Sequence, residues 1–142
     1  MFTAAISFVI PGVPRGKQVA RVTRFGNYTP KQTANELEAV RYIASAAMQG
    51  RPPLEGPLEL RMCAYRPVPA SWSSKERERA LAGLVLPISR PDGSNYQKLL
   101  EDGCNHIVWH DDSQITRWQG WKLYSDTPRL SVEVIPIILP GS

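Results

Sequence analysis

The sequence has no hydrophobic run long enough to cross a membrane. No apolar run approaches the roughly 20 consecutive residues that a membrane-spanning helix requires. The N-terminus also lacks a basic region followed by an apolar block and a cleavage site. We therefore expect a cytoplasmic protein that makes no contact with membranes.

Cysteine is scarce, with only two residues in a chain of 142. Cys63 and Cys104 lie far apart, and neither belongs to a paired spacing of the kind that binds zinc. This pattern excludes a disulfide framework and a zinc-finger type of site, and it favours free thiols.

Acidic residues are missing from the start of the chain, where no Asp or Glu precedes Glu36. The net charge of the whole chain is +4, and much of the basic excess falls in this segment. Clustered basic residues are typical of proteins that bind a phosphate backbone, although a solvated basic face is the alternative. We expect a basic arm at about residues 11–28 and DNA contacts from Arg15, Lys17, Arg21, Arg24 and Lys31.

The hydrophobic pattern predicts an α+β fold within one domain that spans residues 1–142. Alternation predicts strands at 5–10 and 57–65, and a C-terminal hairpin formed by 114–124 and 129–138. Helical spacing predicts a helix at 29–48, capped by Thr29, and a short charged helix at 75–82. The apolar run 84–88 should lie at a sheet edge or be extended. Helices are therefore expected on one face of a two-layer domain with a mixed, mostly antiparallel sheet.

The segment from Arg90 to Ile115 holds the candidate chemistry. Ser94 with Gln97 suggests a helix cap, so the central helix should begin at Asn95. Its buried stripe should contain Tyr96, Leu99, Leu100, Gly103, Cys104 and Ile107, which leaves Asn95, Lys98, Glu101, Asp102 and Asn105 on the other face.

Aspartates flank this helix on both sides. Asp92 precedes it, whereas Asp111 and Asp112 follow it. Mg²⁺ prefers such oxygen ligands, and a lysine at position 98 could neutralise charge on a phosphate. The alternatives are ordinary turn residues and, for Lys98 with Asp102, an exposed helix pair.

The central motif resembles the signature of RusA-type Holliday-junction resolvases, and of their phage-type members in particular. The resemblance rests on the Pro91–Asn95 segment, on Lys98 and Asp102, and on the Trp109–Ile115 segment. Weaker matches occur at Ile10-Pro11-Gly12 through Arg21, at Tyr28-Thr29-Pro30-Lys31 and at Lys122-Leu123-Tyr124.

This resemblance implies a homodimeric, Mg²⁺-dependent endonuclease that nicks four-way DNA junctions symmetrically, in recombination and repair. It implies that Asp92 and Asp112 bind metal and that Lys98 is catalytic. Asp111 and Asp102 are weaker candidates for metal binding. A two-fold dimer suits a junction because two equivalent active sites can meet two equivalent strands.

Ser94 departs from the family pattern, which has a second aspartate at this position. A hydroxyl is a poor substitute for a carboxylate on Mg²⁺, although Glu101 or Asp102 could supply the missing charge. Two alternatives therefore stay open: a junction-binding protein with impaired catalysis, and a nuclease that acts on branched DNA in general.

Overall fold

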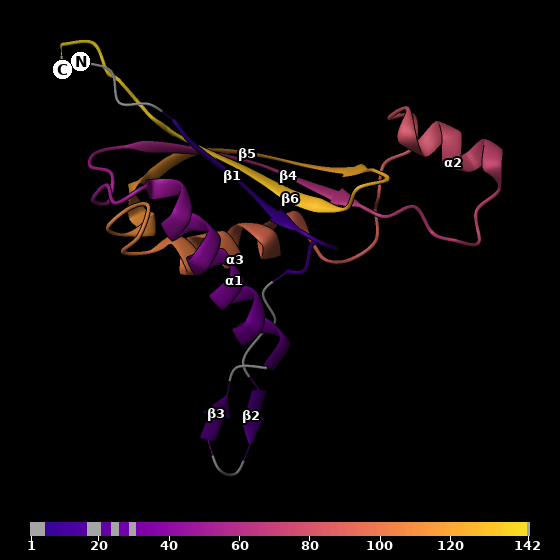
Figure 1. Cartoon of the computed structure of the whole chain (residues 1–142), viewed down its shortest axis with the longest axis horizontal. Helices are drawn as coiled ribbons and strands as arrows, with labels where there is room; N and C mark the ends of the chain where they lie inside the picture. Colours follow the sequence, from indigo (N-terminus) through magenta and orange to yellow (C-terminus); the bar gives the residue numbers. More distant parts are fainter. Residues whose placement is uncertain (1–4, 17–20, 24–25, 29–30, 142) are drawn as a thin grey trace.

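The structure, a computed structural model, describes residues 5–16, 21–23, 26–28 and 31–141. Figure 1 shows the arrangement of the elements. In chain order they are β1 (Ile6–Pro11), β2 (Arg21–Thr23), β3 (Gly26–Tyr28), α1 (Lys31–Met48), β4 (Leu58–Arg66), α2 (Ser74–Leu81), α3 (Gly93–Cys104), the short 3-10 helix η1 (Asp112–Gln114), β5 (Ile115–Tyr124) and β6 (Arg129–Pro136).

Four strands form the main sheet in the order β1-β6-β4-β5. The β1–β6 and β6–β4 pairs are antiparallel, and the β4–β5 pair is parallel. The mixed, mostly antiparallel sheet is confirmed. The predicted C-terminal hairpin is wrong, because β4 lies between β5 and β6. In the sequence, a turn-forming segment of four residues connects β5 to β6 and favours a hairpin. In the fold, β4 is buried between these two strands, so they do not pair with each other.

Helices α1 and α3 pack on the same face of this sheet (Figure 1). The alternating side chains of β1, β4 and β6 that face the helices form the core, as the pattern predicted. The predicted helix stripes are also confirmed. Their fully buried members are Val40, Ala44 and Met48 from α1 and Tyr96, Leu99, Leu100, Gly103 and Cys104 from α3, with Leu37, Ala47 and Ile107 partly buried beside them.

The opposite face of the sheet carries a buried charge that alternation placed on the exposed side. Glu59 is only 3% exposed. Its carboxylate accepts a hydrogen bond from Arg61 Nε and lies 3.4 Å from Arg117 Nη1. Two guanidinium groups therefore cover Glu59 and compensate its charge, which is the condition for burying a carboxylate.

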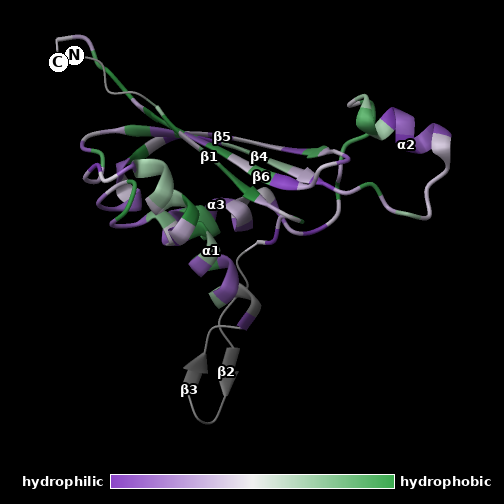
Figure 2. Ribbon diagram, viewed as in Figure 1, coloured by the Kyte–Doolittle hydropathy of each residue, from purple (hydrophilic) through white to green (hydrophobic). Residues whose placement is uncertain are grey.

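Helix α2 lies apart from the core at one end of the sheet, and Figure 2 colours much of it hydrophilic. Ser73 caps this helix, since its hydroxyl accepts a hydrogen bond from Glu76 N at 3.2 Å. The link from α2 to α3 forms turns and bends without a strand. An exposed ion pair of 2.9 Å between Arg77 and Asp126 links α2 to the turn between β5 and β6.

The predicted arm contains a two-stranded hairpin, in which Arg21 pairs with Tyr28. In Figure 1 it extends beyond the first turns of α1. Thr29 and Pro30, the predicted cap and first residue of the helix, lie outside the described residues. No helix in the described part of the chain is long and apolar enough to cross a membrane.

Candidate functional site

Asp92 is the N-cap residue of α3. Its backbone is extended (φ −69°, ψ 152°), and Asn95 N donates to its carbonyl oxygen at 3.0 Å. The prediction that Ser94 caps the helix is therefore wrong, because α3 already begins at Gly93. Both residues are favoured at N-caps, so composition alone could not choose between them. The Asp92 side chain is exposed and makes no capping hydrogen bond, which leaves its carboxylate available.

The polar face of α3 carries the remaining candidates on the helix. Lys98 is exposed, and Glu101 and Asp102 are half-buried. Glu101 accepts a hydrogen bond of 2.8 Å from Gln97 Nε2, one turn earlier. The ammonium of Lys98 is therefore carried on the same helix face as two carboxylates, as the helical spacing predicted.

A buried tryptophan orients Asp112 at the far end of α3. Trp109 is fully buried, and its Nε1 donates to Asn105 Oδ1 at 2.7 Å. The Asn105 amide then donates to Asp112 Oδ1 at 3.3 Å. This chain of hydrogen bonds links the carboxylate to the core. The sequence did not reveal this role of Asn105, since only the fold brings the three residues together.

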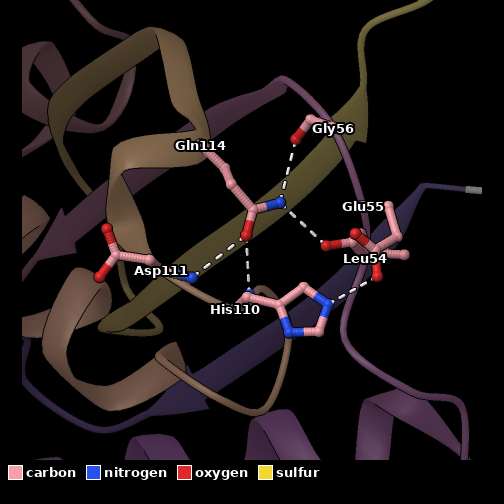
Figure 3. A network of polar contacts seen from close by, with 6 residues as sticks. All are labelled: Leu54, Glu55, Gly56, His110, Asp111 and Gln114. Atoms are coloured by element: carbon pink, nitrogen blue, oxygen red, sulfur yellow. Dashed lines mark hydrogen bonds and ion pairs between the residues drawn. The ribbon is translucent and has the colours of Figure 1, made fainter.

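Asp111 and Gln114 form a capping box around η1 (Figure 3). The Gln114 carbonyl accepts from His110 N and Asp111 N, and its amide donates to Leu54 O and Gly56 O. Gln114 thereby fastens this segment to the chain before β4. The signal was present in the sequence, because Asp-x-x-Gln is a variant of the capping-box pattern.

The Asp111 carboxylate points away from the Gln114 side chain in Figure 3 and is exposed to solvent. It accepts a hydrogen bond of 3.0 Å from Ser113 N. Hydrogen bonding to the Ser113 side chain, and then to the Ser113 backbone, stabilises the charged form and lowers the pKa of Asp111 below its ordinary value. Asp111 therefore has a cap role that needs no metal.

The structure places Asp92 and Asp112 at opposite ends of α3. The helix has twelve residues and so is about 18 Å long. Its start is tied to the end of β4, because Arg66 Nη1 donates to Arg90 O at 2.6 Å. Asp112 instead lies beside the start of β4, where Ile115 pairs with Leu58. One chain therefore does not bring these two carboxylates together.

The described residues contain no group of three or more His, Cys, Asp or Glu side chains that could hold a metal ion. The donor chemistry still suits Mg²⁺, since every candidate is a carboxylate oxygen. What does not fit is the placement within one chain.

The structure describes only some of the predicted DNA-binding residues. Arg15 and Lys31 are exposed, and Arg21 begins β2. Lys17 and Arg24 lie outside the described residues.

Comparison with known proteins gives one family match and one close relative. The model of the family described as "Endodeoxyribonuclease RusA" matches residues 11–135 of this chain. An uncharacterised protein of Bacillus subtilis (strain 168), YqaN, is 35% identical over 137 residues, which cover 94% of this chain and 93% of YqaN. The matched region includes α3 and the aspartates at both of its ends.

Proposed function

This chain belongs to the RusA endodeoxyribonuclease family, and on that premise we propose that it resolves four-way DNA junctions by symmetric phosphodiester hydrolysis. The observation that carries the proposal is the family match across α3, which bears Lys98 on its polar face and aspartates at its two ends. Recombination and repair are the processes that such an activity would serve.

We propose that the reaction requires Mg²⁺ and that Asp92 and Asp112 bind it, with Asp111 and Asp102 as further candidates. Lys98 would neutralise charge on the scissile phosphate. Because Asp92 and Asp112 lie at opposite ends of α3, these two carboxylates of one chain do not share a metal site. A second copy is the simplest source of the missing group.

A homodimer that pairs through β5 would supply that group. β5 is an edge strand of ten residues, and it exposes 55% of Trp118 and 50% of Trp121. A long, exposed, apolar edge favours pairing with another strand. Two copies of β5 related by a two-fold axis would run antiparallel, with the axis near Gly120 at the middle of the strand.

This pairing would place the end of one β5 beside the start of the other. The start of α3 lies at the end of its own β5, since Lys122 Nζ donates to Ser89 O at 2.7 Å. Asp112 begins η1, which directly precedes β5. Asp92 of one copy would therefore lie on the same side of the dimer as Asp112 of the other.

Nicking of a synthetic four-way junction by the purified protein in Mg²⁺ tests the proposed activity. We expect paired nicks at symmetric positions, and little cutting of a linear duplex of the same sequence. The variant Glu78→Gln, at an exposed position of helix α2 apart from the core, should act as the wild type does. Equal cutting of both substrates would favour a general nuclease, and no nicking with any divalent ion would refute both.

A second candidate function is junction binding with impaired catalysis. Ser94 favours it, because the structure places this residue in the first turn of α3, next to Asp92, where the family pattern has an aspartate. This protein would bind junctions tightly without nicking them.

We expect Ser94→Asp to lower the Mg²⁺ concentration for half-maximal nicking by about tenfold, which corresponds to roughly 1.4 kcal/mol of added binding energy. Ser94 is exposed, and an acid in the first turn of a helix is favourable, so folding should be unaffected. A Mg²⁺ titration measures the effect. Nicking by the variant alone would favour the second candidate, and an unchanged midpoint would contradict a metal role at this position.

A further inference from the structure

A pocket of about 520 Å³ lies between residues 13–16, at the beginning of the arm, and the start of α3. Three arginines line it: Arg15 from the segment 13–16, Arg66 from the end of β4, and Arg90 from the link that precedes Asp92. We call this the arginine pocket. Among the residues that the structure describes, no acidic one lines it.

Arg66 is held in place by neutral acceptors. Its Nη1 donates to Arg90 O at 2.6 Å and to the Tyr96 hydroxyl at 3.2 Å. Tyr96 is 1% exposed, and burial raises the pKa of its hydroxyl, although Arg66 opposes this shift. The hydroxyl therefore stays neutral at physiological pH. In the described part of the chain, none of the ion pairs involves these three arginines.

The backbone around Gly16 is packed against the first turn of α3. A Cβ atom at Gly16 would lie 2.8 Å from Asn95 Cβ and 3.0 Å from Pro91 Cβ, distances at which something must shift. This contact holds Arg15 beside the start of the helix. The positive end of the α3 dipole adds to the field at the same place.

We propose that the arginine pocket binds a DNA backbone phosphate that neighbours the one cleaved at Asp92. Guanidinium groups match the geometry of phosphate oxygens, and three of them around one pocket without a carboxylate attract an anion. Because Arg90 precedes Asp92 by two residues, a strand seated in the pocket would pass the candidate catalytic end of α3. The proposal rests on the proposed function, and it gives a role to Arg66 and Arg90, which the sequence pattern did not single out.

Binding of junctions that carry a neutral methylphosphonate at one phosphate tests this proposal. Dissociation constants would be measured in EDTA for the full chain and for Arg90→Gln. At one or two positions, the neutral linkage should weaken wild-type binding by about tenfold, as expected for a lost charge-assisted contact. At those positions it should have no further effect on Arg90→Gln, because the contact is already absent. The salt dependence of Arg90→Gln should also fall by about one counterion.

Two further variants separate the pocket from general effects. Arg15→Gln changes the opposite wall without touching the hydrogen bonds of Arg66, and it should reproduce the result. Lys75→Gln, on the distant helix α2, should behave as the wild type does. Neutral linkages that weaken wild-type and Arg90→Gln binding equally at every position would overturn the proposal.

A binding measurement with inorganic phosphate distinguishes a DNA phosphate from a free anion as the occupant of the arginine pocket. Suppose that phosphate alone binds saturably and that this binding is lost in Arg90→Gln, while no methylphosphonate position depends on Arg90. That combination of results would assign the pocket to a free anion and overturn the proposal. Since binding is measured in EDTA, the pocket can be established even if the junction is not nicked, and nicking can occur even if the pocket proposal fails.

Discussion

Mixing the inactive variants Asp92→Asn and Asp112→Asn should restore junction nicking to about a quarter of the wild-type rate. If the site combines Asp92 of one copy with Asp112 of the other, a mixed dimer contains one intact site and one doubly altered site. Random exchange makes about half of the dimers mixed, so about one site in four is intact. Each variant alone should have background activity. Single-turnover nicking after subunit exchange measures the recovery.

The matched control is a mixture of Asp92→Asn with the double variant Asp92→Asn/Asp112→Asn. It forms mixed dimers equally well but contains no Asp92, so nicking should stay at background. Sedimentation would establish that dimers form and exchange. If the two single variants exchange subunits but nicking does not recover, a site shared between two copies is contradicted. That result would not bear on whether the wild-type protein is a nuclease.

Gly103→Ala should destabilise the protein by about 1 kcal/mol, although alanine favours helices. Gly103 lies where α3 crosses α1, and an added Cβ would lie 2.4 Å from Val40 Cγ1 and 2.8 Å from Val40 Cβ. Val40 is fully buried and β-branched, so it has little freedom to rotate away. Overpacking of about 1–3 kcal/mol should therefore exceed the roughly 1 kcal/mol gained from helix propensity. Urea unfolding measures the loss.

Gly93→Ala provides the control for helix propensity, because no atom lies within 4 Å of a Cβ at that glycine in the first turn of α3. It should be neutral or stabilising. In the double variant Gly103→Ala/Val40→Ala, removal of the Val40 methyl groups should relieve part of the clash, so the total loss should be smaller than the sum of the single losses. A Gly103→Ala protein as stable as the wild type would show that α1 and α3 can separate freely.

Much of the local structure could be predicted because it depends on periodicity. Alternation in β1 and β4 reports which side chains leave water, and the 3.6-residue spacing in α1 and α3 does the same for helices. Motif spacing likewise identified Asp92, Lys98 and Asp112 as candidates within a recognisable family pattern. These inferences involve residues close together in the chain, or one face of one element.

The tertiary structure decided which elements are neighbours, and with that the shape of the candidate site. β5 pairs with β4 rather than with β6, and Glu59 is buried by arginines from two strands. Periodicity could not show either, because the choice of partner depends on packing between distant segments.

The surroundings of the two ends of α3 also depend on packing between segments that are distant in the sequence. The sequence by itself determined that aspartates precede and follow a helix with a buried stripe. Only the fold showed that this helix spans the sheet from the end of β4 to its start, so that Asp92 lies beside the arginine pocket and Asp112 is oriented by Trp109 through Asn105. A rigid helix keeps its ends apart by its length, whereas residues that are distant in sequence, such as Arg15, Arg66 and Arg90, meet only when the chain packs.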